Sequence, residues 1–492
     1  MQNDIIHRLA RRLLRGAIAA ATTSTLIFTA TPATAAPILP EFGIPLGYSD
    51  PSISIGGAET KLPQFNDLSI DPETLKSPTG DGEEKKQPDP RTQDDEYDPF
   101  YDTSTVAIGK PGSVLRTQSA PVAPMPKGID YPLPSSVTKV LYSSKLHDGT
   151  PTAISGYLVE PSVPWTGKGA RPTVVIGRGT VGQGDKCAPS RNWPLNGQPD
   201  PISSNRLVAL EGLYDWAFAA EGVRVFVTDY VGMGTPGIHT YMNRKEQGHA
   251  MLDGARAALN LAGDKGEAPG KVAFYGHSQG GGASAAAAEM ISSYAPDLDG
   301  AAAYASAPPA DLDAVQANID GSDLVGAIGF TINGLVARYP AVADDMKKHL
   351  SEKGQETLDD LATMCTNEIV SAYGHQTTST WTKDGRSLDQ LLDDVPTGRQ
   401  AMQEQFIGSV KPGVPTMVVS GKHDLNVEYG QARTLSRNWC SLGGEVIYRD
   451  DVLPEIKGYN HFAQAISGAP FGLTFILSKF NDVPVSGSCQ GI

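Results

Sequence analysis

One serine lies in a setting that is typical of an activated nucleophile. Ser278 is the centre of GHSQG, the only GxSxG match in the chain. The apolar run VAFY precedes this pentapeptide and the helix-prone run GGASAAAAEM follows it. Such a tight turn between strand and helix forces the serine into a strained backbone conformation and aims its hydroxyl at the positive end of the helix. The pattern therefore predicts a nucleophile for acyl transfer.

A serine hydroxyl is a weak nucleophile and needs a base, which a carboxylate must orient. His461, in GYNHFAQ, follows the last predicted strand, and Asp424 lies just past the strand in VPTMVVSGKHD. The chain order serine, aspartate, histidine is the order expected of α/β-hydrolases. We therefore predict that Ser278 is the nucleophile, Asp424 the acid and His461 the base.

Other histidines and aspartates compete for these roles. His423 adjoins Asp424 but follows the wrong strand, and the backbone geometry of His277 points it away from the neighbouring serine. The remaining rivals are three histidines that could equally be core or surface residues, His239, His249 and His375, and two acids at the end of the next strand, Asp450 and Asp451. The chain-order argument favours Asp424 over both acids.

Acyl transfer also requires hydrogen-bond donors for the developing oxyanion. The first predicted donor is the backbone N–H of Gln279, directly after the nucleophile. The second should come from the glycine-rich loop GRGTVGQGDKCAPS, where we take Thr180 as the candidate. The loop has neither a Lys-Ser/Thr ending nor a GxGxxG pattern, so a phosphate-binding role is not indicated.

The surrounding pattern predicts an α/β fold. Short apolar runs without polar alternation suit strands buried on both faces of a parallel sheet. They are RPTVVIG, VRVFVTDY, KVAFYGH, GAAAYASA, VPTMVVSG and EVIYRDDV, with a strand pair, VTKVLYSS and TAISGYLVE, before them. Helix-like segments alternate with these runs, and a closing helix is expected over 462–480. We predict a mostly parallel sheet with helices on both faces.

The sheet pattern stops for about a hundred residues and then resumes. We interpret 97–308 and 413–492 as two parts of one core, and 309–412 as an inserted helical cap. A second helical domain with no bearing on the site is the alternative. Long insertions in such folds often form lids or binding surfaces, which favours the cap.

The N-terminal region has the composition of an export signal followed by a linker. Residues 1–35 combine a positive start, a weakly apolar run and a small-residue cleavage site after Ala35, which predicts a signal peptide and secretion. The apolar run is too short and too rich in threonine for a membrane anchor. Residues 36–96 are rich in Pro, Gly and acidic residues, so we expect a flexible arm.

Composition restricts the class of function. The chain has 492 residues, 40% of them hydrophobic, and a formal net charge of −15, which argues against a nucleic-acid partner. Its four cysteines, in an exported protein, predict two disulfides with three possible pairings. No CxxC spacing is present, so a thiolate metal site is not indicated.

Together, DPFY, GRGTVGQGDKCAPS, TDYVGMGTPGIHTY, GHSQGGG, GKHDLNV and the NH of residues 460–461 resemble the secretory lipase family, the lipase A type of α/β-hydrolase. The resemblance runs from DPFY to near the C-terminus and implies hydrolysis of carboxylic esters, typically acylglycerols, with no metal or cofactor. It implies the pairings Cys187–Cys365 and Cys440–Cys489. It also leads us to expect transient contact with a lipid interface. The acidic arm is not part of the family pattern.

Three other functions remain as alternatives. Within the same fold, the chain could be a carboxylesterase for short esters or an acyltransferase that uses a sugar alcohol in place of water. From a different class, it could be a catalytically silent binding protein at the cell surface. Labelling by a serine-directed fluorophosphonate separates the silent protein from the enzymes.

Overall fold

The computed structural model describes residues 98–122, 132–192, 206–451, 453–456 and 458–492. The predicted signal peptide, residues 1–35, and the predicted arm, residues 36–96, lie outside the described residues, so both stay predictions.

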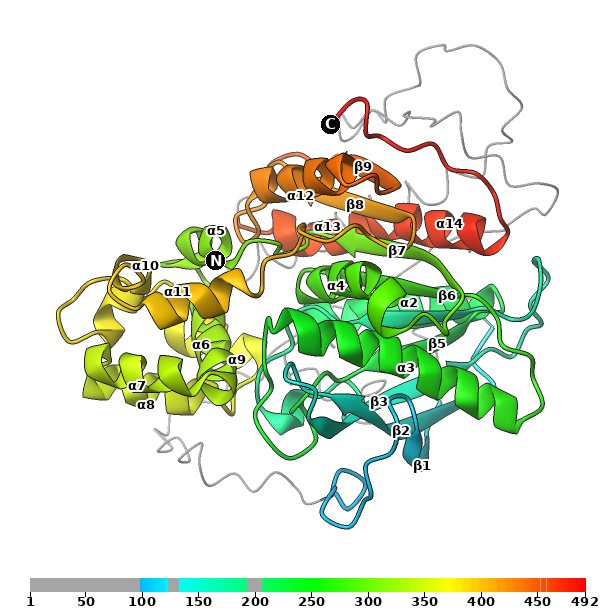
Figure 1. The fold of residues 1–492 in the computed structure, drawn as a ribbon, viewed down its shortest axis with the longest axis horizontal. Helices are drawn as coiled ribbons and strands as arrows, with labels where there is room; N and C mark the ends of the chain where they lie inside the picture. The colour runs from blue at the N-terminus through cyan, green and yellow to red at the C-terminus, as the bar shows by residue number, and fades with distance from the viewer. Residues whose placement is uncertain (1–97, 123–131, 193–205, 452, 457) are drawn as a thin grey trace, which may run out of the picture.

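A twisted sheet of nine strands forms the centre of the described part of the chain. In chain order the strands are β1 (Val114–Ala120), β2 (Ser136–Lys145), β3 (Pro151–Glu160), β4 (Thr173–Gly177), β5 (Arg224–Thr228), β6 (Val272–His277), β7 (Gly300–Ser306), β8 (Thr416–Gly421) and β9 (Val446–Asp451). Their spatial order is β1-β2-β3-β5-β4-β6-β7-β8-β9, from the bottom to the top of Figure 1. The six strands from β5 to β9 in that order are parallel, and β1, β2 and β3 extend the sheet antiparallel.

The predicted α/β fold is confirmed. Every residue of β4, β5, β6 and β8 is buried, which explains why these strands are continuous apolar runs with little polar alternation. The predicted strand pair is the β2–β3 hairpin. The edge strand β1 was not predicted, because its sequence VLRTQSA is largely polar and only its last residue is fully buried.

Helices cover both faces of the sheet. One face packs against α2 (Arg206–Ala220) and α14 (Ala469–Phe480), with α13 (Asn460–Ser467) beside them. The other face packs against α3 (Arg244–Asp264), α4 (Gln279–Tyr294) and α12 (Tyr429–Ser441). The apolar side chains of the strands alternate between these two layers, so the sheet lies between two hydrophobic cores.

The prediction of a single closing helix over 462–480 was wrong. The segment forms two helices, α13 and α14, which are separated by Gly468. Pro470 lies at the start of α14, where its missing N–H costs no intrahelical hydrogen bond. The break matters for the site, because it leaves α13 as a short separate helix that carries His461.

Between β7 and β8 the chain forms a group of helices at one end of the sheet, on the left of Figure 1. They are α5 (Leu312–Ile319), α6 (Gly326–Arg338), α7 (Pro340–His349), α8 (Glu352–Leu361), α9 (Thr366–Tyr373), α10 (Leu388–Leu391) and α11 (Pro396–Gln403). Their apolar faces share one hydrophobic cluster, which Tyr241 and Met242 from the core also enter. We propose that 309–412 is the cap and that 97–308 and 413–492 form the core beneath it.

Two disulfides join distant parts of the described chain. Cys187, after β4, is bonded to Cys365, which caps the start of α9. Cys440, in α12, is bonded to Cys489 near the C-terminus. These are the pairings that the family resemblance implies. The first bond ties the glycine-rich loop to the cap.

Candidate active site

Ser278 occupies a strained turn between β6 and α4. Its φ and ψ are 57° and −123°, a conformation that is rare for a residue with a side chain. The turn is so tight that a Cβ on Gly276 would lie 2.1 Å from the carbonyl oxygen of Gly280. A Cβ on Gly280 would lie 2.0 Å from the carbonyl oxygen of Gly177 on β4. Only glycine fits at both positions, as expected for a nucleophile elbow.

The structure brings Ser278, Asp424 and His461 together, from segments that follow three different strands. His461 Nε2 lies 2.8 Å from Ser278 Oγ, and His461 Nδ1 lies 2.7 Å from Asp424 Oδ2. Both contacts are within hydrogen-bond distance. The serine and histidine are 183 residues apart in sequence. The carboxyl ends of parallel strands β6 and β8 meet at one edge of the sheet, which accounts for the convergence.

The acid and the histidine are both held in place. The second oxygen of Asp424, Oδ1, accepts the backbone N–H groups of Asn426 and Val427 at 2.8 and 2.9 Å. His461 lies in the first turn of α13, where the side chain of Asn460 braces the preceding loop by accepting the Ile456 N–H and donating to the Pro454 carbonyl. Neither ring nor carboxylate is free to turn away, so the three side chains are preorganised.

The rival residues lie elsewhere or have other partners. His277 Nδ1 contacts Ser306 Oγ at 3.0 Å, and the side chains of His423 and His375 are exposed. Asp450 accepts the hydroxyl of Tyr429, while Asp451 accepts that of Ser467. His249 Nδ1 hydrogen-bonds the Lys145 carbonyl.

His239 is buried beside the elbow but does not contact Ser278 in any described hydrogen bond. Its Nδ1 hydrogen-bonds the Val231 carbonyl at 3.0 Å, and its Nε2 accepts from the side-chain amide of Gln279 at 2.9 Å. Burial lowers the pKa of His239 to about 4. The ring is therefore neutral at physiological pH and can accept this hydrogen bond.

The two predicted oxyanion donors come from the elbow itself and from the loop after β4. Gln279 is the first residue of α4, and the first N–H groups of a helix have no intrahelical partner. Thr180 lies in the loop after β4, and its hydroxyl is 2.7 Å from that of Tyr241. The loop approaches the elbow closely, since a Cβ on Gly179 would lie 3.5 Å from the carbonyl oxygen of His277.

A buried charged cluster beneath the glycine-rich loop escaped the sequence prediction. Arg178 Nη2 lies 2.5 Å from Asp215 Oδ2 and 2.6 Å from the Tyr157 hydroxyl. Glu211, one turn before Asp215 on α2, accepts the Gly179 N–H at 3.0 Å. Burial is the main cause that raises the pKa of Glu211 to about 7. Two acids four residues apart in the otherwise apolar segment ALEGLYDWAF were the available signal.

The buried carboxyl of Glu211 predicts a pH-dependent stability. Because its folded pKa is near 7 and its ordinary value is 4.5, the folded chain binds a proton that the unfolded chain has released between these values. Stability should therefore fall as pH rises through this window. Relative to Glu211→Gln, the free energy of unfolding of the wild type should decrease by up to about 3 kcal/mol between pH 4.5 and pH 8. Urea unfolding of both proteins measures the difference, and a difference that is constant with pH would contradict this assignment.

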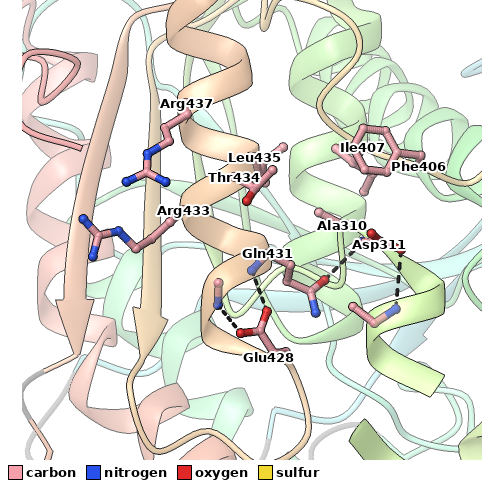
Figure 2. A pocket seen from close by; sticks show the side chains of 12 residues that line it. Ala310, Asp311, Phe406, Ile407, Glu428, Gln431, Arg433, Thr434, Leu435 and Arg437 are labelled. Atoms are coloured by element: carbon pink, nitrogen blue, oxygen red, sulfur yellow. Dashed lines mark hydrogen bonds between the residues drawn. The ribbon is translucent and has the colours of Figure 1, made fainter. Parts of the chain in front are cut away.

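One cavity lies beside the cap rather than at Ser278. It has a volume of about 430 Å³ and lies between α12 and the residues that lead into and out of the cap, as Figure 2 shows. Its lining includes Ala310, Phe406, Ile407 and Leu435. The side chain of Gln431 crosses it to accept the Asp311 N–H at 3.1 Å. None of the three converging residues is among its 12 lining residues.

A second, small cavity of about 30 Å³ lies between the cap helices and the core residues Tyr241 and Met242. Its walls are mostly apolar and come from α5 and α6, with Tyr241 and Met242 from the core. Tyr241 links this cavity to Thr180 through the hydroxyl contact described above. Ser278 is 9% exposed and His461 is 3% exposed, so the converging side chains are covered in this conformation.

The described residues hold no group of three or more His, Cys, Asp or Glu side chains arranged to bind a metal ion. Among the helices that the structure describes, none has the length and apolar character needed to cross a membrane.

Comparison with known proteins places the chain in a family. A family model described as secretory lipase matches residues 206–487. A probable inactive lipase of Mycobacterium tuberculosis is 28% identical over 397 residues, which cover 79% of this chain and 83% of the relative. A secreted triacylglycerol lipase of Malassezia furfur is 27% identical over 307 residues, which cover 61% of this chain and 76% of the relative.

Solved structures show the same fold. Lipase A of Candida antarctica superposes with a TM-score of 0.66 at 20% identity, covering 82% of this chain and 89% of that one. The rice cell wall degrading esterase LipA of Xanthomonas oryzae gives a TM-score of 0.58 at 16% identity, covering 73% of this chain and 97% of that one. At these identities the likeness concerns the α/β-hydrolase fold alone. The family match over more than half of the sequence decides the family: the chain belongs to the secretory lipases, a family of carboxylic ester hydrolases.

Proposed function

We propose that the chain is a secreted serine ester hydrolase that cleaves acylglycerol esters through Ser278, His461 and Asp424. The observation that carries the proposal is the continuous hydrogen-bonded series from Ser278 Oγ to His461 to Asp424, with distances of 2.8 and 2.7 Å. This series starts at a strained serine at the N-terminus of a helix. It has the geometry of a nucleophile with its base and the acid that orients the base.

The mechanism follows from these contacts. His461 Nε2 takes the proton of Ser278 Oγ as the oxygen attacks the ester carbonyl, and the same proton then passes to the leaving alcohol. Asp424 accepts the Nδ1–H of the imidazole, which fixes the tautomer and stabilises the imidazolium. Water attacks the resulting acyl-enzyme by the same route and releases the acid. The N–H groups of Gln279 and Thr180 would stabilise both tetrahedral intermediates.

We place the acyl chain of the substrate under the cap, in the direction of the small cavity between Tyr241 and α6. Its lining supplies apolar contacts through Leu312, Ile319 and Ile328. Since the cavity is only about 30 Å³ in this covered conformation, the cap must shift for a long acyl chain to enter. Leu425, which is 58% exposed beside Asp424, provides an apolar side chain for transient contact with a lipid interface.

Secretion is supported by the two disulfides and by relatives named as secreted lipases. Disulfides persist in oxidising compartments outside the cytosol. We propose that residues 1–35 direct export and that no nucleic-acid partner is involved.

An ester series tests the proposed activity and its substrate class. Purified protein should hydrolyse p-nitrophenyl esters and emulsified triacylglycerols, with activity extending to long acyl chains. A carboxylesterase would be restricted to short soluble esters. An acyltransferase would form a new ester when a sugar alcohol is added.

The mycobacterial relative is named as a probable inactive lipase. A catalytically silent binding protein is therefore the second candidate for this chain. A fluorophosphonate probe distinguishes it directly. We expect one covalent adduct per chain on Ser278, and no adduct on Ser278→Ala. A wild-type protein that stays unlabelled would favour the silent binding protein.

A further inference from the structure

The glycine-rich loop is fixed on both sides of Thr180 by side chains from separate parts of the chain. On one side, the Gly179 N–H donates to Glu211 Oε2 on α2 at 3.0 Å. On the other side, Thr366 Oγ1, at the start of α9 in the cap, donates to the Thr180 carbonyl at 2.7 Å. The Thr180 hydroxyl itself meets that of Tyr241. These bonds hold the peptide units 178–179 and 180–181, which flank the peptide unit that carries the Thr180 N–H.

Glu211, which anchors the loop to α2, is itself held firmly. Glu211 is 5% exposed, and its backbone carbonyl accepts Arg178 Nη1 at 2.7 Å. Because Arg178 also donates to Asp215 on α2, the neighbours Arg178 and Gly179 together make three hydrogen bonds to this helix. The loop cannot shift relative to α2 without breaking these contacts.

Thr366, which anchors the loop to the cap, is held by a short antiparallel pairing of the two segments. The Thr366 N–H donates to the Val181 carbonyl at 2.9 Å, and the Gln183 N–H donates to the Met364 carbonyl at 2.9 Å. Between these two bonds, Gly182 pairs with Cys365, whose sulfur is bonded to Cys187. Thr366 is 5% exposed. These bonds tie this part of the cap to the loop, so the cap shift of the proposed function would involve other cap residues.

The direction of the Thr180 N–H depends on the torsions on either side of its peptide bond. An oxyanion donor contributes to rate only when it is aimed at the oxygen of the tetrahedral state, and losing one donor costs about 10²–10³ in kcat. A loop rich in glycine has the backbone freedom to lose that aim. The two flanking hydrogen bonds remove this freedom.

We propose that Thr366 and Glu211 are positioning residues of the oxyanion site, which aim the Thr180 N–H at the substrate oxygen. The inference rests on the proposed function, in which Thr180 is a donor. It assigns to the cap a part in catalysis, in addition to covering the acyl chain.

Thr366 offers a matched pair of substitutions. Thr366→Val keeps the shape and removes the hydroxyl, while Thr366→Ser keeps the hydroxyl. On a soluble p-nitrophenyl ester, we expect Thr366→Val to lower kcat about 10- to 50-fold, a part of the loss for a whole donor, with KM changed less than about 2-fold. Affinity for a trifluoromethyl ketone, which forms an oxyanion with Ser278, should weaken by a similar factor. Thr366→Ser should restore both values to within about 3-fold.

Thr363→Val is the control for a lost threonine hydroxyl in the same cap segment. Its hydroxyl donates to the Asp360 carbonyl, inside the cap, and its side chain is exposed. We expect wild-type kcat and inhibitor affinity. For the α2 anchor, Glu211→Gln keeps an acceptor oxygen and should stay close to wild type, while Glu211→Met removes it and should behave like Thr366→Val.

The readouts separate positioning from a merely structural role. A Thr366→Val protein with wild-type kcat, or one whose kcat falls while trifluoromethyl ketone affinity is unchanged, overturns the proposal. Thermal unfolding of each variant shows the folded fraction, and a rate loss that only follows that fraction overturns it as well. Absence of Ser278-dependent turnover in the wild type would refute the proposed function and this inference together. Normal wild-type turnover with an unaffected Thr366→Val refutes this inference alone.

Discussion

Ser278→Ala is expected to lower kcat for ester hydrolysis by about 10⁶-fold, the loss seen when the nucleophile of a serine hydrolase is removed. The size of the effect follows from the geometry, since Oγ is the only atom that links the substrate to His461 Nε2 in the proposed mechanism. Substrate binding should persist, because the alanine removes one oxygen from a side chain that is already covered. Steady-state kinetics on a p-nitrophenyl ester measure kcat, and competition of the substrate with an inhibitor measures binding.

Ser284→Ala provides the matched control for this variant. Ser284 lies on α4 two turns from the elbow and is fully buried, and its hydroxyl has no hydrogen-bond partner among the described residues. Removing that hydroxyl should leave kcat within about 3-fold and should not reduce stability, because an unpaired buried polar group is costly. Equal activity of Ser278→Ala and Ser284→Ala would refute the assignment of the nucleophile.

Local sequence was sufficient for the elbow, because all its determinants are close in the chain. The strand VAFY, the glycines at 276 and 280 and the small residues after Ser278 all act over a few residues. Convergence of Ser278 with Asp424 and His461 required one further rule, the fixed chain order at the carboxyl edge of a parallel sheet. The structure brings the three together at the expected edge.

Other features depend on packing between residues that are distant in sequence. The contact between Thr366 and the Thr180 carbonyl spans 186 residues, and no local pattern marks a threonine at a helix start as a partner of a particular loop. Glu211 gave a weak signal, an acid on an apolar helix, but its partner, the Gly179 N–H, is a backbone group without a sequence signature. The disulfide pairing likewise stayed open on the residues alone.

His461→Ala and Asp424→Asn test the remaining two roles, and their effects should differ. Removing the imidazole removes the base, so kcat should fall about 10⁶-fold. The asparagine keeps an oxygen for the Asn426 and Val427 N–H groups, which preserves the loop. Its amide then faces His461 Nδ1 with a donor, which favours the tautomer that carries its proton on Nε2. That tautomer cannot accept the serine proton, and kcat should fall about 10⁴-fold.

Asp450→Asn is the control for the loss of an acid at the same edge of the sheet. Asp450 accepts the Tyr429 hydroxyl and pairs with Lys422, outside the series that leads to Ser278. Its replacement should change kcat less than about 3-fold. If Asp450→Asn lost as much rate as Asp424→Asn, the acid would have been misassigned. Asp424 contacts His461 Nδ1 at 2.7 Å and Asp450 does not, so a rate loss confined to Asp424→Asn supports the role of that bond.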